Sequence, residues 1–337
     1  MSALHSAAPP TVTVVTPAYN VAGYIGEAVD SVLRQTFANF EYLVVDDGSS
    51  DDTVDVVKAH VGSDPRFRLV QGEHRGLSAV RNIGVRLSNS KYVAYLDGDD
   101  IWHPKFLERQ LGLIESLPPN VGAVFCRSRV ILENGTLVYL QWQRSGSYDF
   151  DDFLVRNNPA RNGSSLLIRK SCFEDVGVFD ESMRYVEDLE MWLRIAGGSR
   201  TPVLWASKDY LVDWRLRPGS VTRDRASSSR ALNDLLASHT PRLRRLPAGL
   251  AYVRPAMVAL KYGGDKDLAE EWALKARSVG ISRLMRDTSG LRLLFWYTLP
   301  PVGREAIRSL QGGTRELLKS ANRRLRRGRS SNVGIGQ

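Results

Sequence analysis

The alternation of strand-like and helix-like segments over the first hundred residues limits the fold more than any other feature of this sequence. β-branched and apolar runs predict four strands, at residues 11–16, 42–45, 67–70 and 92–96. Between them, apolar side chains at helical spacing or helix-capping residues predict three helices, at residues 21–33, 51–60 and 77–88. Because the connections are short, this order predicts an α/β fold with a Rossmann-like, mostly parallel sheet and helices on both faces.

Several residues are expected to mark the ends of these segments. Pro17 is expected to end the first strand, because proline cannot donate a ladder hydrogen bond. Asn20 is expected to cap the first helix, and Asp51 or Asp52 the second, because their side chains accept hydrogen bonds from free N–H groups in a first helical turn.

Polar residues follow three of the predicted strands at the point where each strand ends. They are Thr16, the pair Asp46-Asp47 and the run Asp97-Gly98-Asp99-Asp100. In open parallel sheets, ligands bind at the carboxyl ends of the strands. These residues are therefore expected to line one crevice, although they lie far apart in the sequence.

The run 97–100 places three carboxylates within four residues after a buried strand. Such carboxylates repel one another unless a cation neutralises them, and Mg²⁺ or Mn²⁺ accepts carboxylate oxygens together with substrate phosphates. Gly98 allows a turn that brings Asp97 and Asp99 toward one ligand. A solvated acidic turn is the alternative, since Asp-Gly is a common turn dipeptide.

Wider stretches of sequence resemble the family 2 glycosyltransferases, which are nucleotide-sugar enzymes of the GT-A fold. The resemblance covers about residues 11–225, and the matching stretches occur in order at 13–20, 44–53, 76–84, 95–100, 186–192 and 214–222. It implies a GT-A domain that transfers a sugar with inversion at the anomeric carbon. The processive-synthase element QxxRW is missing, which favours transfer of single sugars.

The resemblance also implies a donor-binding set. The stretch Thr16, Pro17, Ala18 and Tyr19, with the carboxylate of Asp47, would hold the uracil of a uridine nucleotide. The remaining nucleotide-sugar contacts would come from Arg81, Asp97 and Arg215, with Arg217 as the alternative to Arg215. Asp46 and Asp47 also suit a loop that caps a helix, and Arg81 also suits the surface of an amphipathic helix.

For the chemical step, the resemblance matches Asp97-Gly98-Asp99 to the DxD motif and Glu187-Asp188 to the ED motif. Asp99 and Asp97 would hold Mn²⁺ or Mg²⁺. Asp188 would be the general base that takes the proton of the acceptor hydroxyl, and Glu187 would support it. Acidic residues are also favoured at helix N-termini by the dipole, which is the alternative for this pair. Asp100 is expected to bind metal or to cap the helix near His103-Pro104.

The second part of the chain has a different pattern. Residues 133–136 predict a hairpin turn, 186–196 a helix and 210–214 a strand. From about residue 226 the chain becomes arginine-rich and is expected to be helical. The predicted organisation is a disordered leader, the GT-A domain, a helical basic C-terminal region and a disordered tail, at 1–10, 11–225, 226–329 and 330–337.

The charge of the chain divides along the same line. The 46 Lys and Arg residues against 37 Asp and Glu give a net charge of +9. Residues 1–200 hold 20 basic and 26 acidic residues, a net −6, and the remainder therefore carries +15. An aromatic run at 291–302 and a polybasic cluster at 323–329 favour an anionic membrane surface as the partner of this region. A solvated helical subdomain and nonspecific RNA binding are the alternatives, and no specific nucleic acid is expected.

Cysteine content and hydropathy set the expected compartment. Two cysteines give no disulfide framework, and no run approaches the length of a membrane-spanning helix. A cytoplasmic protein, peripheral on the inner face of the cell membrane, is expected. The predicted function is metal-assisted transfer from a UDP-sugar donor to a saccharide or lipid-linked acceptor in polysaccharide or glycoconjugate biosynthesis. A non-catalytic binding module on the same fold and a nucleotidyltransferase are the alternatives.

Overall fold

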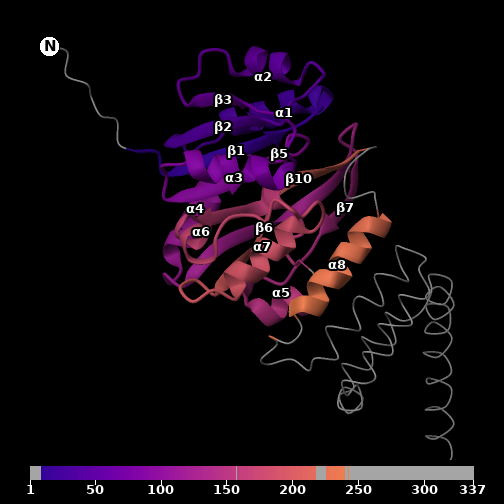
Figure 1. Ribbon diagram of the computed structural model, residues 1–337. Coiled ribbons are helices and arrows are strands. Elements are labelled where there is room, and N and C mark those ends of the chain that lie inside the picture. The colour runs from indigo at the N-terminus through magenta and orange to yellow at the C-terminus, as the bar shows by residue number, and fades with distance from the viewer. Residues whose placement is uncertain (1–8, 157, 218–224, 240–241, 243–337) are drawn as a thin grey trace, which may run out of the picture.

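A computed structural model describes residues 9–156, 158–217, 225–239 and 242, which form one sheet between two layers of helices (Figure 1). The strands are β1 (Val12–Ala18), β2 (Phe40–Asp46), β3 (Phe67–Gln71), β4 (Tyr92–Tyr95), β5 (Ile101–Trp102), β6 (Val121–Leu132), β7 (Leu137–Gln141), β8 (Gly146–Tyr148), β9 (Leu166–Arg169) and β10 (Val203–Leu216). The helices are α1 (Ala22–Leu33), α2 (Thr53–Val61), α3 (Leu77–Leu87), α4 (Phe106–Ser116), α5 (Phe150–Arg156), α6 (Ser171–Val176), α7 (Glu187–Ala196) and α8 (Arg225–His239), with a 3-10 turn at Gly163–Ser165.

The first half of the sheet is parallel, as the sequence predicts, and its strands lie in the order β3-β2-β1-β4. The prediction that Pro17 ends the first strand is wrong, because β1 continues through Pro17 and pairs it with Val45. The carbonyl of Val15 accepts a hydrogen bond from the N–H of Leu96, so the backbone polar groups of Val15 face β4. The backbone nitrogen of Pro17, two residues later, faces the same side. The ladder of β4 has ended there, so the missing N–H of Pro17 removes no strand pairing.

The second half of the sheet is mixed. Strand β9 lies antiparallel between β4 and β6, and β6 then pairs in parallel with the long strand β10. Strands β5, β7 and β8 pair antiparallel at the margins of this half. In the described chain, β1 to β4, β6 and β10 share one direction, which confirms a mostly parallel sheet. The predicted hairpin turn joins β6 to β7, and Gly135 adopts the left-handed φ of 79° that such a turn needs.

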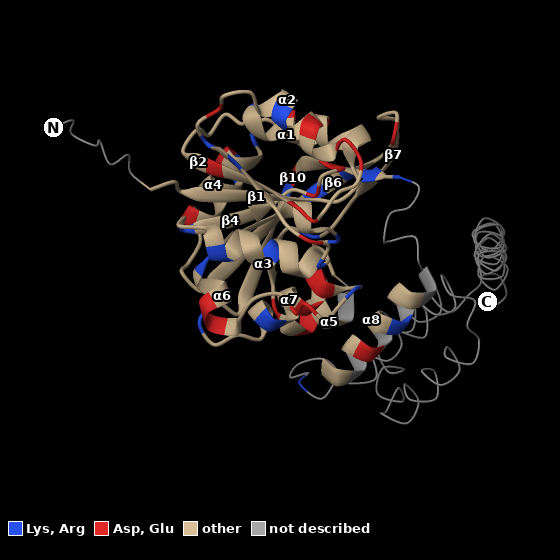
Figure 2. Cartoon of the chain, turned by 45° about the horizontal axis from the view of Figure 1, so that its top comes forward, with Lys and Arg blue, Asp and Glu red and all other residues tan. Residues whose placement is uncertain are grey.

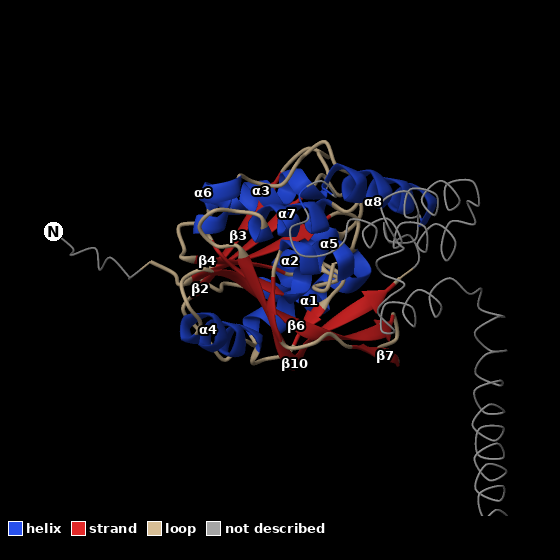
Figure 3. Cartoon of the chain, turned by 90° about the horizontal axis from the view of Figure 1, so that it is seen from below, coloured by secondary structure: helices blue, strands red, loops and turns tan. Residues whose placement is uncertain are grey.

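Each face of the sheet carries its own hydrophobic core. Helices lie on either side of the strands (Figure 3). Helices α1, α2 and α4 cover one face, where Ile25, Val57 and Phe106 are fully buried. Helices α3, α5, α6, α7 and α8 cover the other, around the fully buried Trp192. The prediction that Trp192 belongs to the core is therefore confirmed, and apolar strands are required because both faces of the sheet are covered.

The helix caps are shared between neighbouring loops. Asn20 does not cap α1; its side-chain oxygen accepts a hydrogen bond from the Ser50 N–H. The N–H groups of Val21 and Ala22 donate instead to Thr53 and Asp51, so the loop before α2 caps the start of α1. Asp51 also accepts from the N–H of Thr53, the first residue of α2. Asp52 is the N-cap residue of α2, but its side chain makes no capping hydrogen bond.

The C-terminal predictions fall mostly outside the described residues. Helix α8 agrees with helical structure after residue 226, and it contributes Leu232 and Leu235 to one core. The leader over residues 1–8, the arginine-rich region beyond residue 242 and the tail at 330–337 lie outside the described chain. No helix within the described ranges is long and apolar enough to cross a membrane.

Candidate active site

The carboxyl ends of β1, β2 and β4 place the predicted site residues along one edge of the sheet. Strand β1 ends beside β2, where the Asp47 N–H donates to the Ala18 carbonyl at 2.8 Å. The run 97–100 follows β4. The last residue of β1 that pairs with β4 is Val15, one residue before Thr16. Residues as far apart in the sequence as Thr16 and Asp100 thus meet at one edge, as parallel topology requires.

Asp47 organises the loop that precedes α3. Its two carboxylate oxygens accept hydrogen bonds from the backbone N–H groups of Arg75 and Gly76, at 2.8 and 2.9 Å. The ring nitrogen Nδ1 of His74 lies 2.9 Å from the same carboxylate. The ring of His74 stacks on Tyr19, with 4.1 Å between the ring centroids. Tyr19 is 43% exposed, so this pair presents an aromatic surface beside a buried carboxylate.

The other members of the predicted Thr16–Tyr19 stretch are strand residues. Thr16 is fully buried, and its hydroxyl oxygen accepts a hydrogen bond from the Tyr42 hydroxyl of the neighbouring strand. Pro17 and Ala18 lie in β1 and are buried as well. Among these four residues, Tyr19 therefore offers the side chain to solvent, and its neighbours fix its position.

Arg81 joins the two acidic motifs. It projects from α3 and is only 2% exposed, so a surface position on an amphipathic helix is excluded. Its guanidinium donates to Asp97 at 3.1 Å and to Glu187 at 2.8 Å. Aromatic rings of Tyr95 and Phe179 lie within 5.7 Å of the guanidinium carbon. Arg81 is the physical link between the DxD-like turn and the ED-like helix start.

Three carboxylates follow β4, and the structure gives each a different partner. Asp97 accepts from Arg81, and Asp99 from the Arg217 Nε at 2.5 Å. Asp100 accepts from the Ser164 hydroxyl and from the backbone N–H of Arg215. Asp100 therefore does not cap the helix after His103, and α4 begins only at Phe106. Burial raises the pKa of both Asp99 and Asp100, and the charge on their acidic neighbours raises it further.

A divalent cation fits this turn as a partner shared with a phosphate ligand. No group of three His, Cys, Asp or Glu ligands that could hold a metal occurs in the described part of the chain. The charge of Asp97 raises the pKa of Asp99, so the two carboxylates lie near each other. Mg²⁺ and similar ions are commonly held by one or two carboxylates plus phosphate oxygens and water, so this pair matches that donor set.

Arg215 is a tether within the protein. Its guanidinium donates to the carbonyl oxygens of Asp99 and Glu133 and to the carboxylate of Glu27, at 2.8 to 2.9 Å. It is 4% exposed. Arg217, on the same strand end, contacts the Asp99 carboxylate directly. These bonds tie the end of β10 and the β6–β7 turn to the acidic turn after β4.

Glu187 and Asp188 form the first turn of α7, where acidic residues appear red in Figure 2. Burial raises the pKa of Glu187 to about 7, although the Arg81 charge opposes the shift. Burial also raises the pKa of Asp188, which accepts hydrogen bonds from Asn158 and from the Leu189 N–H. Val186, just before them, has a left-handed φ of 55°. A β-branched residue rarely adopts this conformation, so the surrounding contacts hold the chain in a strained path.

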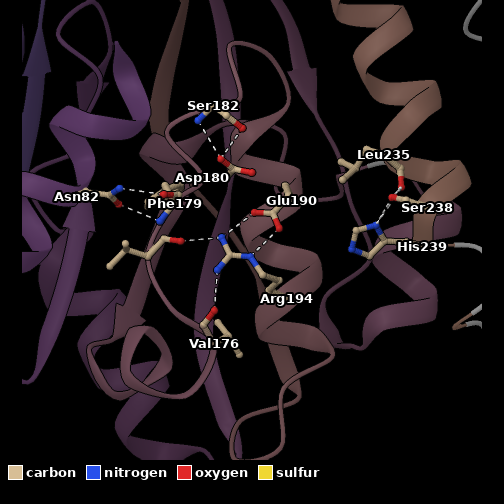
Figure 4. Close-up of polar contacts among 11 residues, drawn as sticks. Asn82, Val176, Phe179, Asp180, Ser182, Glu190, Arg194, Leu235, Ser238 and His239 are labelled. Carbon is tan, nitrogen blue, oxygen red and sulfur yellow. Dashed lines mark hydrogen bonds and ion pairs between the residues drawn. The ribbon is translucent and has the colours of Figure 1, made fainter. Parts of the chain in front are cut away.

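Two side chains fix the loop that leads into this turn (Figure 4). Asn82 on α3 donates to the carbonyl of Phe179 and accepts from its N–H, both at 2.9 Å. Arg194 on α7 pairs with Glu190 and donates to the carbonyls of Val176 and Val178. The loop between α6 and α7 is therefore held by hydrogen bonds from α3 at Phe179 and from α7 at Val176 and Val178.

Sequence reasoning missed several contributors to the site. Asn158, which holds Asp188, lies in a loop with a positive φ of 48° and carries no motif of its own. His74 has no metal-ligand spacing, and its stacking on Tyr19 depends on the β3–α3 loop. Ser164 donates to Asp100 and accepts from the Asp97 N–H across 67 residues. Such long-range partners leave no periodic signal in the sequence.

Part of the sequence matches a known protein family. Residues 13–177 match the family model described as glycosyl transferase family 2. The matched residues form a family 2 glycosyltransferase domain. An uncharacterised glycosyltransferase of Rickettsia prowazekii is 26% identical over 240 residues, which is 70% of this chain and 73% of that protein.

Solved structures of glycosyltransferases share the fold. The mannosyltransferase PcManGT of Pyrobaculum calidifontis, in complex with GDP-Man and Mn²⁺, aligns with a TM-score of 0.55 at 20% identity, over 85% of this chain and 79% of that one. S. aureus TarS 1–349 in complex with UDP-GlcNAc aligns with a TM-score of 0.54 at 17% identity, over 81% and 73%. This glycosyltransferase therefore has the GT-A type of architecture expected from its sequence.

Proposed function

We propose that this glycosyltransferase moves a sugar from a UDP-activated donor to a hydroxyl of a saccharide or lipid-linked acceptor, with inversion. The observation that carries the proposal is the bridge made by Arg81, which brings Asp97 and Glu187 to one buried guanidinium. Donor-side and acceptor-side carboxylates then share one crevice, as direct displacement at a single carbon requires.

Donor binding is assigned to the edge near β1 and β2. Tyr19 and His74 offer a stacking surface for a base, and Asp47 lies beside them with its carboxylate fixed by backbone N–H groups. Thr16, Pro17 and Ala18 support Tyr19 from within the strand. One structural neighbour is in complex with GDP-Man, so the nucleobase that this site binds is to be decided by experiment.

The chemical step is assigned to Asp188. Its carboxylate takes the proton of the acceptor hydroxyl while the acceptor oxygen bonds to the anomeric carbon. The bond between that carbon and the diphosphate oxygen breaks with its electron pair, and UDP leaves. Asn158 and the Leu189 N–H orient Asp188, and Glu187 holds Arg81 in place.

Asp97 and Asp99 are proposed to hold Mn²⁺ or Mg²⁺ with the diphosphate. When bound, such an ion supplies positive charge that stabilises the departing diphosphate. Donation from Arg217 to Asp99 and from Arg215 to the Asp99 carbonyl keeps the turn in place. We assign Arg215 to the diphosphate side of the crevice, and we place the enzyme in the cytoplasm at the inner face of the membrane.

The test is release of nucleoside diphosphate by the full chain across a panel of UDP-, GDP- and dTDP-sugars, with Mn²⁺, Mg²⁺ or EDTA. We expect turnover with at least one UDP-sugar and its loss in EDTA. Turnover restricted to GDP-sugars would refute the uridine assignment. Absence of release from every donor, with or without metal, would refute the enzymatic function.

A further inference from the structure

The β6–β7 hairpin concentrates the exposed apolar surface of the described chain. Nine large apolar side chains are exposed in the described ranges, and six of these lie between residues 132 and 142. We call these six the hairpin patch: Leu132, Leu137, Val138, Tyr139, Leu140 and Trp142, which are 42%, 52%, 48%, 49%, 51% and 67% exposed. Apolar surface clustered in this way marks a site of interaction rather than chance exposure.

The hairpin patch covers both faces of one strand. Leu140 pairs with Arg129 and Tyr139 with Val130, so these two side chains lie on opposite faces. Residues 137–140 of β7 are all apolar and all exposed, and a register shift interrupts the alternation before Tyr139. Strand β7 pairs with β6 and with no other described strand, so it forms a margin of the sheet (Figure 3). A folded partner that packs on one face leaves the other face in water. A second copy that pairs along the free edge leaves both faces in water.

Arginines accompany the patch on one face. Arg129 pairs across the ladder with Leu140, although its guanidinium is held by the carboxylate of Asp213. Arg127, two residues away, stacks over the ring of Trp142. Arg127 also lies over Tyr210, and Arg144 beyond the strand is exposed. Leucine, tryptophan, tyrosine and arginine together are the side chains that enter the headgroup region of a bilayer, where arginine meets anionic phosphate.

The position of the hairpin relates it to the crevice. The carbonyl of Glu133, in the turn, accepts a hydrogen bond from Arg215, which also donates to the Asp99 carbonyl. Tyr24 of α1 donates to the Glu133 carboxylate from the other side. A partner surface that binds the hairpin therefore lies close to the acidic turn after β4.

We propose that the hairpin patch docks on an anionic phospholipid bilayer and inserts the side chains of both faces of β7 at headgroup depth. Free backbone groups at the edge of β7 exclude deeper insertion, because the hydrocarbon core offers them no hydrogen-bond partners. The docking does not depend on the transferase reaction. Its consequence, delivery of a lipid-linked acceptor to the crevice, rests on the proposed function.

The experiment measures partition of the full chain onto vesicles of phosphatidylcholine with and without phosphatidylglycerol, with no donor or acceptor present. Two double variants address the two faces: Leu140→Thr with Trp142→Thr on the face of Arg129, and Leu132→Thr with Tyr139→Thr on the face of Val130. Val178→Thr, which changes a half-exposed apolar residue elsewhere, is the control. Thermal unfolding confirms that each variant is folded.

We expect wild type to bind vesicles that contain phosphatidylglycerol. Each double variant should bind at least about tenfold more weakly, since tenfold corresponds to burial of roughly one large apolar side chain and each double variant removes two. The control should bind like wild type. Unchanged binding in both doubles, or an effect of one face alone, would overturn the proposal. So would light scattering that shows a dimer of wild type which the doubles abolish.

A conservative change tests the same idea without altering the strand. Brominated phospholipid quenches tryptophan fluorescence at short range, and Trp142→Phe should remove part of the quenching seen in wild type. Equal fractional quenching in the two proteins would show that Trp142 does not enter the bilayer and would overturn the proposal.

Discussion

The parallel half of the sheet and the mixed half bring their acidic residues to the same guanidinium, that of Arg81, by different means. In the parallel half, β1, β2 and β4 end at one edge, and loops that directly follow the strands supply Asp47 and Asp97. In the mixed half, Asp188 comes from the start of α7, and it is positioned by Asn158 and by a loop that Asn82 and Arg194 fasten. Topology places the proposed donor side, whereas side-chain contacts place the proposed base, Asp188.

This difference has an energetic consequence. A strand end is fixed by the backbone ladder, so it tolerates the loss of single side chains. The ED-like turn depends on a few buried polar contacts, one of which is the Arg81–Glu187 pair. Substitutions at the junction of the two halves are therefore expected to lower the free energy of unfolding strongly. Substitutions within one half should lower it less.

The largest effect is expected for Asp188→Asn. Because the amide cannot accept the acceptor proton, the rate of transfer should fall about 10²- to 10⁴-fold, with little change in thermal stability. Initial rates of UDP release with the donor found in the panel measure it. Glu115→Gln on α4, which removes an exposed carboxylate, is the control and should retain full activity. Near-wild-type turnover of Asp188→Asn would remove Asp188 from the mechanism.

Arg81→Met tests the junction itself. The change leaves Asp97 and Glu187 without their shared cation, so the free energy of unfolding should fall by about 3–5 kcal/mol. Urea denaturation measures this loss. Arg86→Met, on the same helix with a half-exposed pair to Glu181, should cost less than about 1 kcal/mol. Equal losses in the two variants would mean that Arg81 does not join the halves.

The pH dependence of stability reports on the mixed half. Folding raises the pKa of Glu187 from 4.5 to about 7, so the native state holds its proton more tightly than the unfolded state. Stability from this group is present below about pH 4.5 and is lost as the pH rises to 7, by about 3 kcal/mol in total. Asp188, Asp99 and Asp100 act in the same direction.

Urea titrations at pH 5 and pH 8 check this expectation, with Glu187→Gln as the comparison. The variant cannot ionise at this position, so its stability should decline less than that of wild type between the two pH values. An identical decline in both proteins would assign the pH dependence to other carboxyls.

The smallest effects are expected within the parallel half. A Cβ at Gly84 on α3 would lie 2.5 Å from Val15 Cγ2 on β1, so Gly84→Ala should destabilise the fold by about 1–3 kcal/mol. A Cβ at Gly23 on α1 would meet no atom within 4 Å, and Gly23→Ala should be stabilising by about 0.5–1 kcal/mol. Thermal unfolding of both variants compares them. Similar shifts would show that α3 does not press closely on β1.

Much of the parallel half follows from short stretches of sequence. Apolar runs and helical spacing predicted β1 to β4 and α1 to α3 with small errors at their ends. The extension of β1 through Pro17 was not predicted, because it depends on where β4 stops. For β10, only residues 210–214 were predicted out of Val203–Leu216, since its pairing with β6 is shifted at several points. Irregular pairing obscures the two-residue period on which strand prediction depends.

The site divides in the same way. Carboxylates at strand ends and at a helix start were located from the sequence, because each lies next to a recognisable element. The partners of those carboxylates could not be located from the sequence. The contacts of Arg81, Arg215 and Asn158 are with residues 16 to 188 positions away. For Arg81, a surface position was one of two interpretations, and burial excludes it.

By itself, the sequence determined the order of strands and helices and the chemistry of the residues at their ends, because periodicity and turn residues act over a few positions. Only the tertiary structure decided which charges meet. Arg81 became a buried bridge and Arg215 a tether because the low dielectric of the interior requires each buried charge to have partners, and folding brings those partners from distant segments. The hairpin patch is the counterpart at the surface: its apolar residues were readable from the start, but their exposure on both faces of β7 was decided by the fold.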